Sequence, residues 1–422
     1  MKNYGTFLFR LGIFLLPSAF FISSILLTLS LIISFFISDL RKIFTDKLNL
    51  IFFVASVLMI IICILQFFIG DTSNIEESGD WNKYLSWIGL GNWIPLFLCF
   101  WGFQIYLINL NERKITAKFL IAGSIPVLVS GFGQYFFDWH GPINTLNELI
   151  VWYQRPLISE YQGLSGLFNN QNYAGCWLNI ILPFSIAILF ESKSNIFKKG
   201  TSVVIAISIS LAIFLTSSRS AWSGLLLTFP LLFGTSFLYW FLPLILSMFF
   251  IIFLNQYDFF PQNIQELFNF LKFENIVNEF QEDNYTNVEK RSKIFLYAIK
   301  KIIENPILGL GAGSFPIFYL IKYKTYIGHT HNLFLELTFN YGIIVSSVIF
   351  INILVICYLG FVKIYVQGGK NNFFEKAWFT SFFVLICSQM VDIEYFDGRI
   401  SIIFWVLLAG IKNNIKVIRH EY

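Results

Sequence analysis

Apolar residues fall into long runs along this chain, and most runs are close to the length of a membrane-spanning helix. Such a helix needs about 20 predominantly apolar residues, because the lipid interior cannot satisfy open backbone polar groups. Residues 220–234 form a shorter run, and residues 7–38 are too long for one span and contain Pro17, which favours a hairpin of two short spans. The other runs lie near residues 49–69, 93–110, 118–137, 172–190, 201–218, 236–254, 332–361, 376–391 and 399–412. The pattern predicts an all-α, polytopic transmembrane helix bundle of about twelve spans.

Two long polar segments separate these runs, at residues 138–171 and 255–331. In the second, a large extracytoplasmic loop, apolar residues recur at helical spacing over 261–280 and 291–305. The latter is the clearer amphipathic helix, ended by Pro306. One face carries Ile294, Phe295, Ala298, Ile299, Ile302 and Ile303, and the other carries Lys293, Lys300, Lys301 and Glu304. We expect such helices to lie on the membrane surface or to pack over the bundle.

These features divide the chain into three regions. Residues 1–160 form an N-terminal transmembrane region, residues 161–360 form a core that includes the loop 255–331, and residues 361–422 supply the last spans and a cytoplasmic tail. The N-terminal basic flank is followed by apolar residues without a small-residue cleavage signal, so we expect a retained first span.

Composition excludes a soluble protein. Hydrophobic residues make up 56% of the 422 residues and charged residues only 13%, whereas soluble domains carry about a quarter charged residues. The five cysteines all lie in apolar runs, which favours small buried side chains over disulfides or a cysteine metal site.

The placement of charge predicts an orientation. With twelve spans and a cytoplasmic N-terminus, every cluster of Lys and Arg falls on the cytoplasmic side, where such clusters are enriched. The acidic segments 71–83 and 392–397 then fall outside. The clusters are Arg41/Lys42/Lys47, Arg113/Lys114/Lys118, Lys193/Lys198/Lys199, Lys363/Lys370/Lys376 and Lys412/Lys416/Arg419. We expect a multi-pass membrane protein with both termini in the cytoplasm.

Two arginines on the outer side are candidates for an anion site. Arg219, in "TSSRSAWSG", lies between two apolar runs and departs from the charge pattern. It fits either a side chain that snorkels to lipid headgroups or a fork of donors for phosphate oxygens. Arg291 begins the amphipathic helix, where an anion would be favoured, although the run "EKRSK" is also typical of a solvated loop.

The histidine pair in "GHTHNLFLEL" is the third candidate. His329 and His331 lie two residues apart at the start of an apolar run. No further His or Cys lies in this segment to complete a zinc site, so such a site would need carboxylate ligands. A histidine at the mouth of a membrane site suits general-base catalysis, because its pKa lies near neutrality, and Asn332 could orient it. The nearby "GLGAGS" lacks the flanking strand and helix of a nucleotide loop, and we interpret it as a tight turn.

In order and in type, four blocks resemble the O-antigen ligase and O-antigen polymerase superfamily of bacterial membrane glycosyltransferases. They cover roughly residues 160–350, and the first 150 residues match only as a pattern of spans. The blocks are "GLFNNQNYAG" (166–175), "TSSRSAW" (216–222), "RSKIFLYAIKKIIENPILGLGAGSF" (291–315) and "HTHNLFLELTFNYG" (329–342). In the first block Gln171 stands where the family usually has proline.

The resemblance implies a reaction and roles for residues. A glycan carried on a polyprenyl diphosphate would be transferred to an acceptor hydroxyl at the outer face of the inner membrane, without metal or cofactor and without nucleic acid as a partner. Arg219 and Arg291 would hold the diphosphate, and His331, with His329 as the second candidate, would be the base. Asn172, Asn332 and Tyr161 are candidate glycan contacts.

The resemblance leaves the acceptor open. A ligase would use lipid A-core, a polymerase would use the next repeat unit of an O-antigen or exopolysaccharide, and some relatives use pilin. One long late loop with only a moderate earlier one tilts the interpretation toward the ligase.

A multi-span transporter, of the kind called bicarbonate transporters in some relatives, is the alternative of another class. It would place ionisable groups at mid-membrane, whereas the candidates here gather at one interface.

Overall fold

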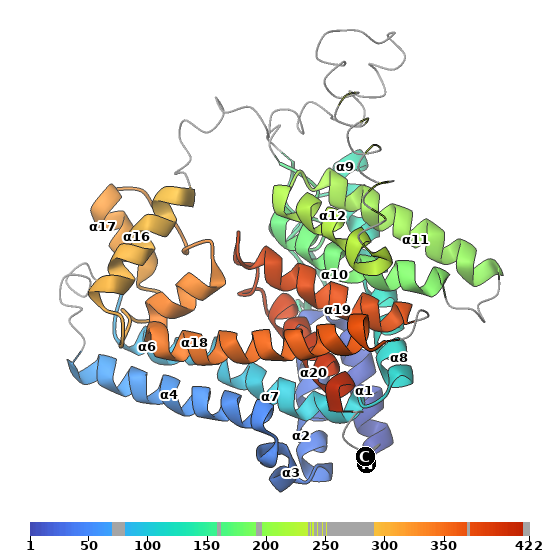
Figure 1. Cartoon of the computed structure of the whole chain (residues 1–422). Helices are drawn as coiled ribbons and strands as arrows, with labels where there is room; N and C mark the ends of the chain where they lie inside the picture. Colours follow the sequence, from blue (N-terminus) through green and yellow to red (C-terminus); the bar gives the residue numbers. More distant parts are fainter. Residues whose placement is uncertain are drawn as a thin grey trace. The chain divides into compact units, whose positions relative to one another are not determined.

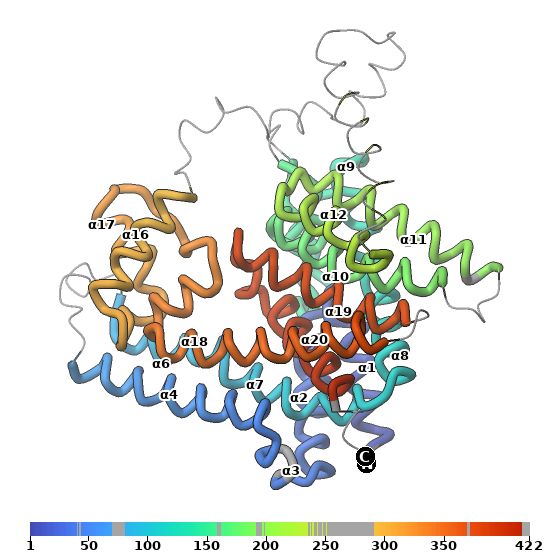
Figure 2. The backbone as a smooth tube through the Cα atoms, in the orientation of Figure 1, coloured from blue at the N-terminus to red at the C-terminus, as the bar shows by residue number. Residues whose placement is uncertain are grey.

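The computed structural model describes residues 1–69, 81–157, 162–190, 196–234, 291–368 and 372–416, with isolated positions between 237 and 250. These residues divide into two compact units. Unit 1 combines Met1–Gly123 with Lys290–Tyr422, and unit 2 is Ser124–Glu289. Figures 1 and 2 show both as helical, as the apolar runs predict.

Unit 1 is a helical bundle in which the long helices α4 and α18 pack side by side (Figures 1 and 2). α18 also contacts α16 and α20, α1 packs against α2 and α8, and α7 packs against α20. The helices are α1 (Lys2–Leu15), α2 (Phe20–Ile37), α3 (Leu40–Thr45), α4 (Lys47–Ile69), α6 (Tyr84–Gly89), α7 (Ile94–Phe103), α8 (Leu110–Gly123), α16 (Arg291–Glu304), α17 (Phe315–Tyr323), α18 (Leu333–Phe361), α19 (Phe373–Ser388) and α20 (Gly398–Lys416). Short 3-10 turns at Leu90–Asn92 and Gln104–Tyr106 flank α7, and a π-turn at Val362–Val366 extends α18.

The described residues of unit 2 form four helices and one short hairpin. α10 contacts both α11 and α12, and α11 also contacts α9. The helices are α9 (Ile125–Phe137), α10 (Gln171–Leu189), α11 (Ile196–Leu215) and α12 (Arg219–Phe233). The antiparallel strands β1 (Ile143–Thr145) and β2 (Ile150–Trp152) pair Ile143 with Trp152.

Six helical segments in the described ranges are long and apolar enough to cross a membrane. They are Phe20–Ile37, Lys47–Ile69, Tyr84–Tyr106, Leu110–Phe137, Gln171–Leu189 and Leu333–Val366. The predicted count of about twelve is therefore not confirmed, because α1, α12 and α19 are shorter than 18 residues and α11 has a shorter apolar stretch. Most of the predicted span 236–254, and residues 255–290 of the predicted loop 255–331, lie outside the described residues.

The predicted hairpin at the N-terminus is present. α1 ends at Leu15 and α2 begins at Phe20, so the chain breaks around Pro17 and the two helices then pack together. Ser23 donates a hydrogen bond to the carbonyl of Gly12 across the pair at 2.8 Å. A hydroxyl satisfied in this way is compatible with burial between helices.

Two buried ion pairs of unit 1 lie near helix ends. Arg113, near the start of α8, pairs with Glu375 in the first turn of α19. Lys412, near the end of α20, lies 3.0 Å from Asp46 and donates to Gln104 at 2.8 Å. Buried charges need such partners, because an isolated one is strongly disfavoured. These pairs connect helix ends and do not form a line of ionisable groups along the spans.

The turn after α16 is anchored on α18. The Leu310 N–H donates to the Phe339 carbonyl at 2.7 Å, and the Ile343 N–H donates to the Pro306 carbonyl at 2.8 Å. Gly309, Gly311 and Gly313 all have positive φ, which confirms the tight turn that the sequence predicts. Gly342 breaks the helical geometry of α18 with φ 82° and ψ 168°. The backbone of the turn, at Pro306 and Ile307, packs directly against it.

Replacing Gly342 with alanine should destabilise unit 1. A Cβ there would lie 1.9 Å from the Ile307 carbonyl oxygen, and positive φ disfavours any residue with a Cβ. The backbone effect alone corresponds to about 1–3 kcal/mol. Thermal unfolding of the purified protein in detergent should therefore shift to lower temperature for Gly342→Ala. Gly328→Ala is the control, since no atom lies within 4 Å of its Cβ position, and an equal shift in both variants would contradict this account.

Candidate functional site

Two loops of unit 1 are fixed to each other at the start of α18 by one side-chain and one backbone hydrogen bond. Asn332 caps that helix, because its Oδ1 accepts from the Leu335 N–H at 3.0 Å. Its Nδ2 donates to the Met390 carbonyl at 2.9 Å, and the Leu333 N–H donates to the Gln389 carbonyl at 2.9 Å. The segment after α19 is thereby held against the segment that carries both histidines.

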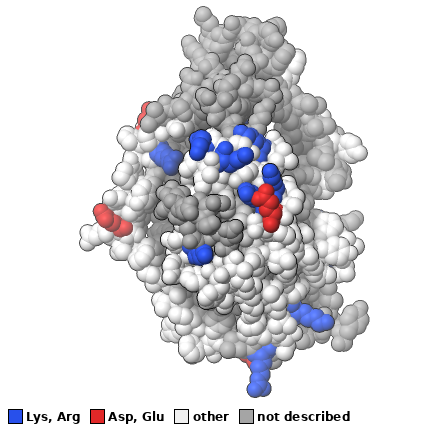
Figure 3. All heavy atoms as spheres, turned by 90° about the vertical axis from the view of Figure 1, so that its left-hand side faces the viewer, with Lys and Arg blue, Asp and Glu red and all other residues white. Residues whose placement is uncertain are grey.

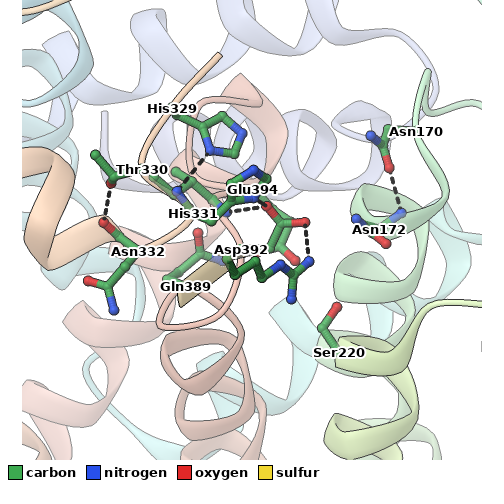
Figure 4. Close-up of polar contacts among 12 residues, drawn as sticks. Asn170, Asn172, Ser220, His329, Thr330, His331, Asn332, Gln389, Asp392 and Glu394 are labelled. Atoms are coloured by element: carbon green, nitrogen blue, oxygen red, sulfur yellow. Dashed lines mark hydrogen bonds and ion pairs between the residues drawn. The ribbon is translucent and has the colours of Figure 1, made fainter. Parts of the chain in front are cut away.

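This arrangement brings His331 to Asp392, a residue 61 positions later in the sequence. His331 Nδ1 lies 2.9 Å from Asp392 Oδ1 (Figure 4). Since a carboxylate accepts, Nδ1 carries the hydrogen and Nε2 of the neutral ring is the unprotonated nitrogen. His331 adopts φ 55°, which is uncommon for a residue with a side chain. Its side chain keeps 24% of its surface exposed, so the ring is accessible.

Arg291 completes the set from the first residue of α16. Its guanidinium nitrogen lies 3.7 Å from Asp392 Oδ2, and its side chain remains 44% exposed. Burial would raise the pKa of Asp392, but the His331 hydrogen bond and the neighbouring His329, His331 and Arg291 outweigh burial, so this pKa lies below its ordinary value. Asp392 is therefore an ionised carboxylate between an imidazole and a guanidinium.

His329 differs from His331 in its surroundings. Its Nδ1 accepts the backbone N–H of His331 at 3.2 Å, so Nε2 carries the hydrogen of the neutral ring. Burial, together with the His331 and Arg291 charges, lowers the pKa of His329 to about 4 despite the opposing effect of Asp392. At neutral pH this ring is neutral and presents an N–H donor on Nε2, which favours His331 over His329 as the base.

A second carboxyl group, Glu394, lies fully buried in the same loop as Asp392. It accepts from the Ser388 hydroxyl at 2.7 Å and from the Gln389 amide at 2.8 Å. Gln389 in turn accepts the Tyr395 N–H at 2.9 Å. These bonds close the loop on itself and hold the backbone on either side of Asp392. Burial, and secondly the Asp392 charge, raise the pKa of Glu394 to about 8.

The arrangement also offers donors for a cation. One ligand atom from each of His329, His331 and Asp392 lies within 4.8 Å of the others. However, Asp392 already bonds to His331 Nδ1 and lies beside the Arg291 guanidinium, so a divalent ion would have to displace one partner and would meet a positive charge. The contacts fit a hydrogen-bonded His–Asp pair better than a metal centre.

The other predicted site residues lie elsewhere or serve the fold. Both ends of the Asn332 side chain bond to backbone, which assigns it to holding the loops together. Arg219 is the exposed first residue of α12 in unit 2, after the Ser218 cap, and its membership of the same site stays a prediction. Tyr161 lies outside the described residues.

Asn172 lines a polar pocket of about 180 Å³ in unit 2. Asn170 caps α10 by accepting the Asn172 N–H at 2.7 Å (Figure 4), and Gln171 Oε1 accepts the Gly163 N–H at 2.6 Å. A proline side chain has no oxygen that could accept this hydrogen bond. Glutamine at this position therefore adds a link to the preceding loop. The pocket is lined by Arg155, Leu157, Gln162, Gly163, Ser165, Asn169, Asn170, Gln171 and Asn172. Amide and guanidinium groups of this kind suit the hydroxyls of a sugar.

Sequence reasoning missed Asp392 and Glu394 as site residues. It treated "VDIEYFDG" only as an acidic outer segment that supports the topology. The available signal was a pair of carboxylates in a short loop between two apolar runs, on the side that carries the histidines. Which carboxylate meets which histidine depends on the packing of α18, α19 and α20.

The buried Glu394 predicts a specific pH dependence of stability. In the unfolded chain a glutamate titrates near pH 4.3, whereas the folded pKa is raised to about 8. Between these values the folded protein holds the extra proton, so its stability falls as pH rises through that window. Thermal unfolding from about pH 5 to about pH 8 should show this slope. Glu394→Gln should flatten it, whereas Glu148→Gln, an exposed site in unit 2, should retain it. An unchanged slope in Glu394→Gln would contradict the assignment.

Comparison with known proteins bears on the same residues. A family model described as O-antigen ligase matches residues 203–350, which include Arg219, Arg291, His329 and His331. No curated protein matches the chain. Together with the six apolar helices, the match supports a multi-pass membrane enzyme of the O-antigen ligase or polymerase type. The predicted resemblance to the O-antigen ligase superfamily is thus confirmed, with the matched region extending from α11 into α18.

Proposed function

We propose that this protein is a membrane glycosyltransferase that moves a glycan from a polyprenyl diphosphate to an acceptor hydroxyl, with His331 as the general base. The observation that carries the proposal is the 2.9 Å bond between His331 Nδ1 and Asp392, with Arg291 beside the other carboxylate oxygen. Arg291 and His331, each at the start of a helix, lie within the region that matches the O-antigen ligase family, and Asp392 lies beyond it.

The proposed base has the orientation that proton transfer needs. Because Asp392 fixes the hydrogen on Nδ1, Nε2 is free to accept the acceptor's hydroxyl proton. The nearby carboxylate then stabilises the imidazolium that forms, as a carboxylate does when it orients a catalytic histidine. His329 stays neutral and offers its Nε2 hydrogen to a sugar or phosphate oxygen.

The proposed step balances as a substitution at the anomeric carbon. The acceptor oxygen forms a bond to that carbon as its proton passes to His331 Nε2, and the bond from the carbon to the diphosphate oxygen breaks. The electron pair of this bond leaves with the polyprenyl diphosphate. Arg291, whose guanidinium is nearly half exposed, would stabilise the negative charge that develops there. Arg219 is proposed as the second diphosphate contact and the Asn172 pocket as a glycan contact.

The donor is proposed to bind at the outer face of the bacterial inner membrane, with both termini in the cytoplasm. The basic clusters of the sequence support this orientation. A ligase that uses lipid A-core is the preferred acceptor assignment, and a polymerase that extends a glycan, or a ligase that uses pilin, shares the same base chemistry. Within the described residues, the buried pairs Arg113–Glu375 and Lys412–Asp46 lie near helix ends, which favours the enzyme over a transporter with a mid-membrane relay.

Loss of His331 should abolish transfer in cells. In a strain that lacks this protein, complementation with His331→Ala should lower long surface glycan about 100- to 10,000-fold, the usual contribution of a general base. Asp392→Asn should lower it by roughly tenfold or more, because the amide no longer fixes the tautomer. A glycan gel, with membrane levels of each variant checked by immunoblot, measures both.

The matched control is His140→Ala, which removes an exposed histidine of unit 2 whose Nδ1 lies 3.0 Å from the Asp138 carbonyl oxygen. Because His140 is exposed, this variant should restore the full pattern. Full glycan in the His331→Ala strain would contradict the base assignment. If the strain that lacks the protein keeps normal surface glycan, the glycosyltransferase proposal fails and a transport role comes forward.

A further inference from the structure

α16 has two apolar faces, and only one of them is used by the fold. Ile294, Tyr297 and Ala298 are buried, and they form a core with α17 and α18 through Phe315, Tyr319 and Phe339. On the same helix Leu296, Ile299 and Ile303 are 68%, 42% and 71% exposed. The sequence pattern had placed Ile299 and Ile303 on one face with Ile294, and the structure corrects this.

The exposed residues form a continuous stripe. Positions 296, 299 and 303 follow one another at intervals of three and four, so they share one side of the helix, roughly opposite the buried side. Ile307, which is 57% exposed, follows at the next interval of four, just beyond the end of the helix. Isolated exposed aliphatic residues need no explanation, but three in one row on a helix of a polar segment, with a fourth just beyond its end, do.

The stripe continues into the surface of a membrane-spanning helix. The Ile307 backbone lies against Gly342 in α18, and the Ile343 N–H donates to the Pro306 carbonyl at 2.8 Å. Ile343 and Ile344 are 39% and 47% exposed, and they belong to the span Leu333–Val366. Exposed aliphatic side chains on a span face lipid. The stripe of α16 therefore ends where the lipid-facing surface of α18 begins.

Basic residues accompany the stripe. Lys293 and Lys300 on α16 and Lys322 and Lys324 near the end of α17 are exposed. Glu304, the acidic residue of α16, is paired with Lys301 at 2.7 Å. Figure 3 shows that basic side chains gather on the face of the molecule that it presents, with few acidic ones among them. An exposed apolar stripe with flanking lysines is the pattern of a helix that lies in the interface of an anionic bilayer.

We propose that the stripe Leu296, Ile299, Ile303 and Ile307 is inserted into the outer-leaflet surface of the bilayer, with the flanking lysines on anionic lipid headgroups. The two faces of α16 then have different surroundings. The buried face packs on α17 and α18, and the stripe contacts acyl chains. Because Arg291 is the first residue of α16, this docking holds its guanidinium at the level of lipid phosphates. That last step rests on the proposed function; the docking itself does not.

The test measures the depth of α16 in the full-length protein in nanodiscs of phosphatidylcholine with phosphatidylglycerol. A nitroxide is attached at Ile303→Cys or Leu296→Cys, and at Glu304→Cys as the neighbouring control. Collisions with oxygen, which concentrates in lipid, and with a water-soluble nickel chelate are then compared. The unsubstituted protein gives the background from the five native cysteines, all of which lie in apolar segments.

The proposal expects the ratio of oxygen to nickel accessibility to be several-fold higher at 303 and 296 than at 304. When phosphatidylglycerol is omitted, this ratio should fall at both stripe positions. Equal nickel accessibility at 303 and 304 would place the stripe in water and overturn it. Protection at 303 and 296 from both probes would mean that protein covers the stripe, which also overturns it. Since depth is measured without catalysis, loss of glycosyl transfer and loss of docking are distinguished.

Discussion

The hydrogen bond between His331 and Asp392 requires that two loops far apart in sequence are held in a fixed position relative to each other. The hydrogen bonds from Asn332 to Met390 and from Leu333 to Gln389 fix that position. Proton transfer is sensitive to sub-ångström placement, so a base on a loop needs rigid support. Here the support comes from the Asn332 cap of α18 and from the hydrogen bond that the Leu333 N–H donates to the Gln389 carbonyl.

The loop that carries Asp392 is in turn stabilised by a buried acid. Glu394 has no exposed surface, and it accepts from both Ser388 and Gln389. With a pKa raised to about 8 it is largely protonated at neutral pH, which spares the loop a second negative charge beside Asp392. The charge of Asp392 is thus left to interact with His331 and Arg291. The pKa values of two neighbouring carboxyl groups move apart because one of them has cationic partners and the other has none within its hydrogen-bonded cluster.

Sequence alone predicts the features that arise from local pattern. Hydropathy gives the helical class and the positions of most helices, and Pro17 gives the hairpin. The histidine pair marks the candidate site because the motif is contiguous. Asp392 was out of reach, because 61 residues and two helices separate it from His331 and only packing brings them together. The buried face of α16 was predicted only in part, again because packing decides it. Periodicity identifies an apolar helix, but it does not say which of two apolar sides packs against the protein. The count of about twelve spans is not confirmed, because helices such as α12 and α19, although about as long as the apolar runs that predict them, have fewer than 18 residues.

The central claim is that His331, oriented by Asp392, activates an acceptor hydroxyl against a lipid diphosphate donor without a metal ion. Reconstituted protein, supplied with a polyprenyl-diphosphate oligosaccharide and a lipid A-core acceptor in excess chelator, tests it by following glycan transfer and diphosphate release together. The account predicts one polyprenyl diphosphate released for each glycan transferred, at a rate unaffected by chelator and abolished in His331→Ala. Transfer that stops with chelator and returns with a divalent ion would contradict it, and would make His329, His331 and Asp392 ligands instead.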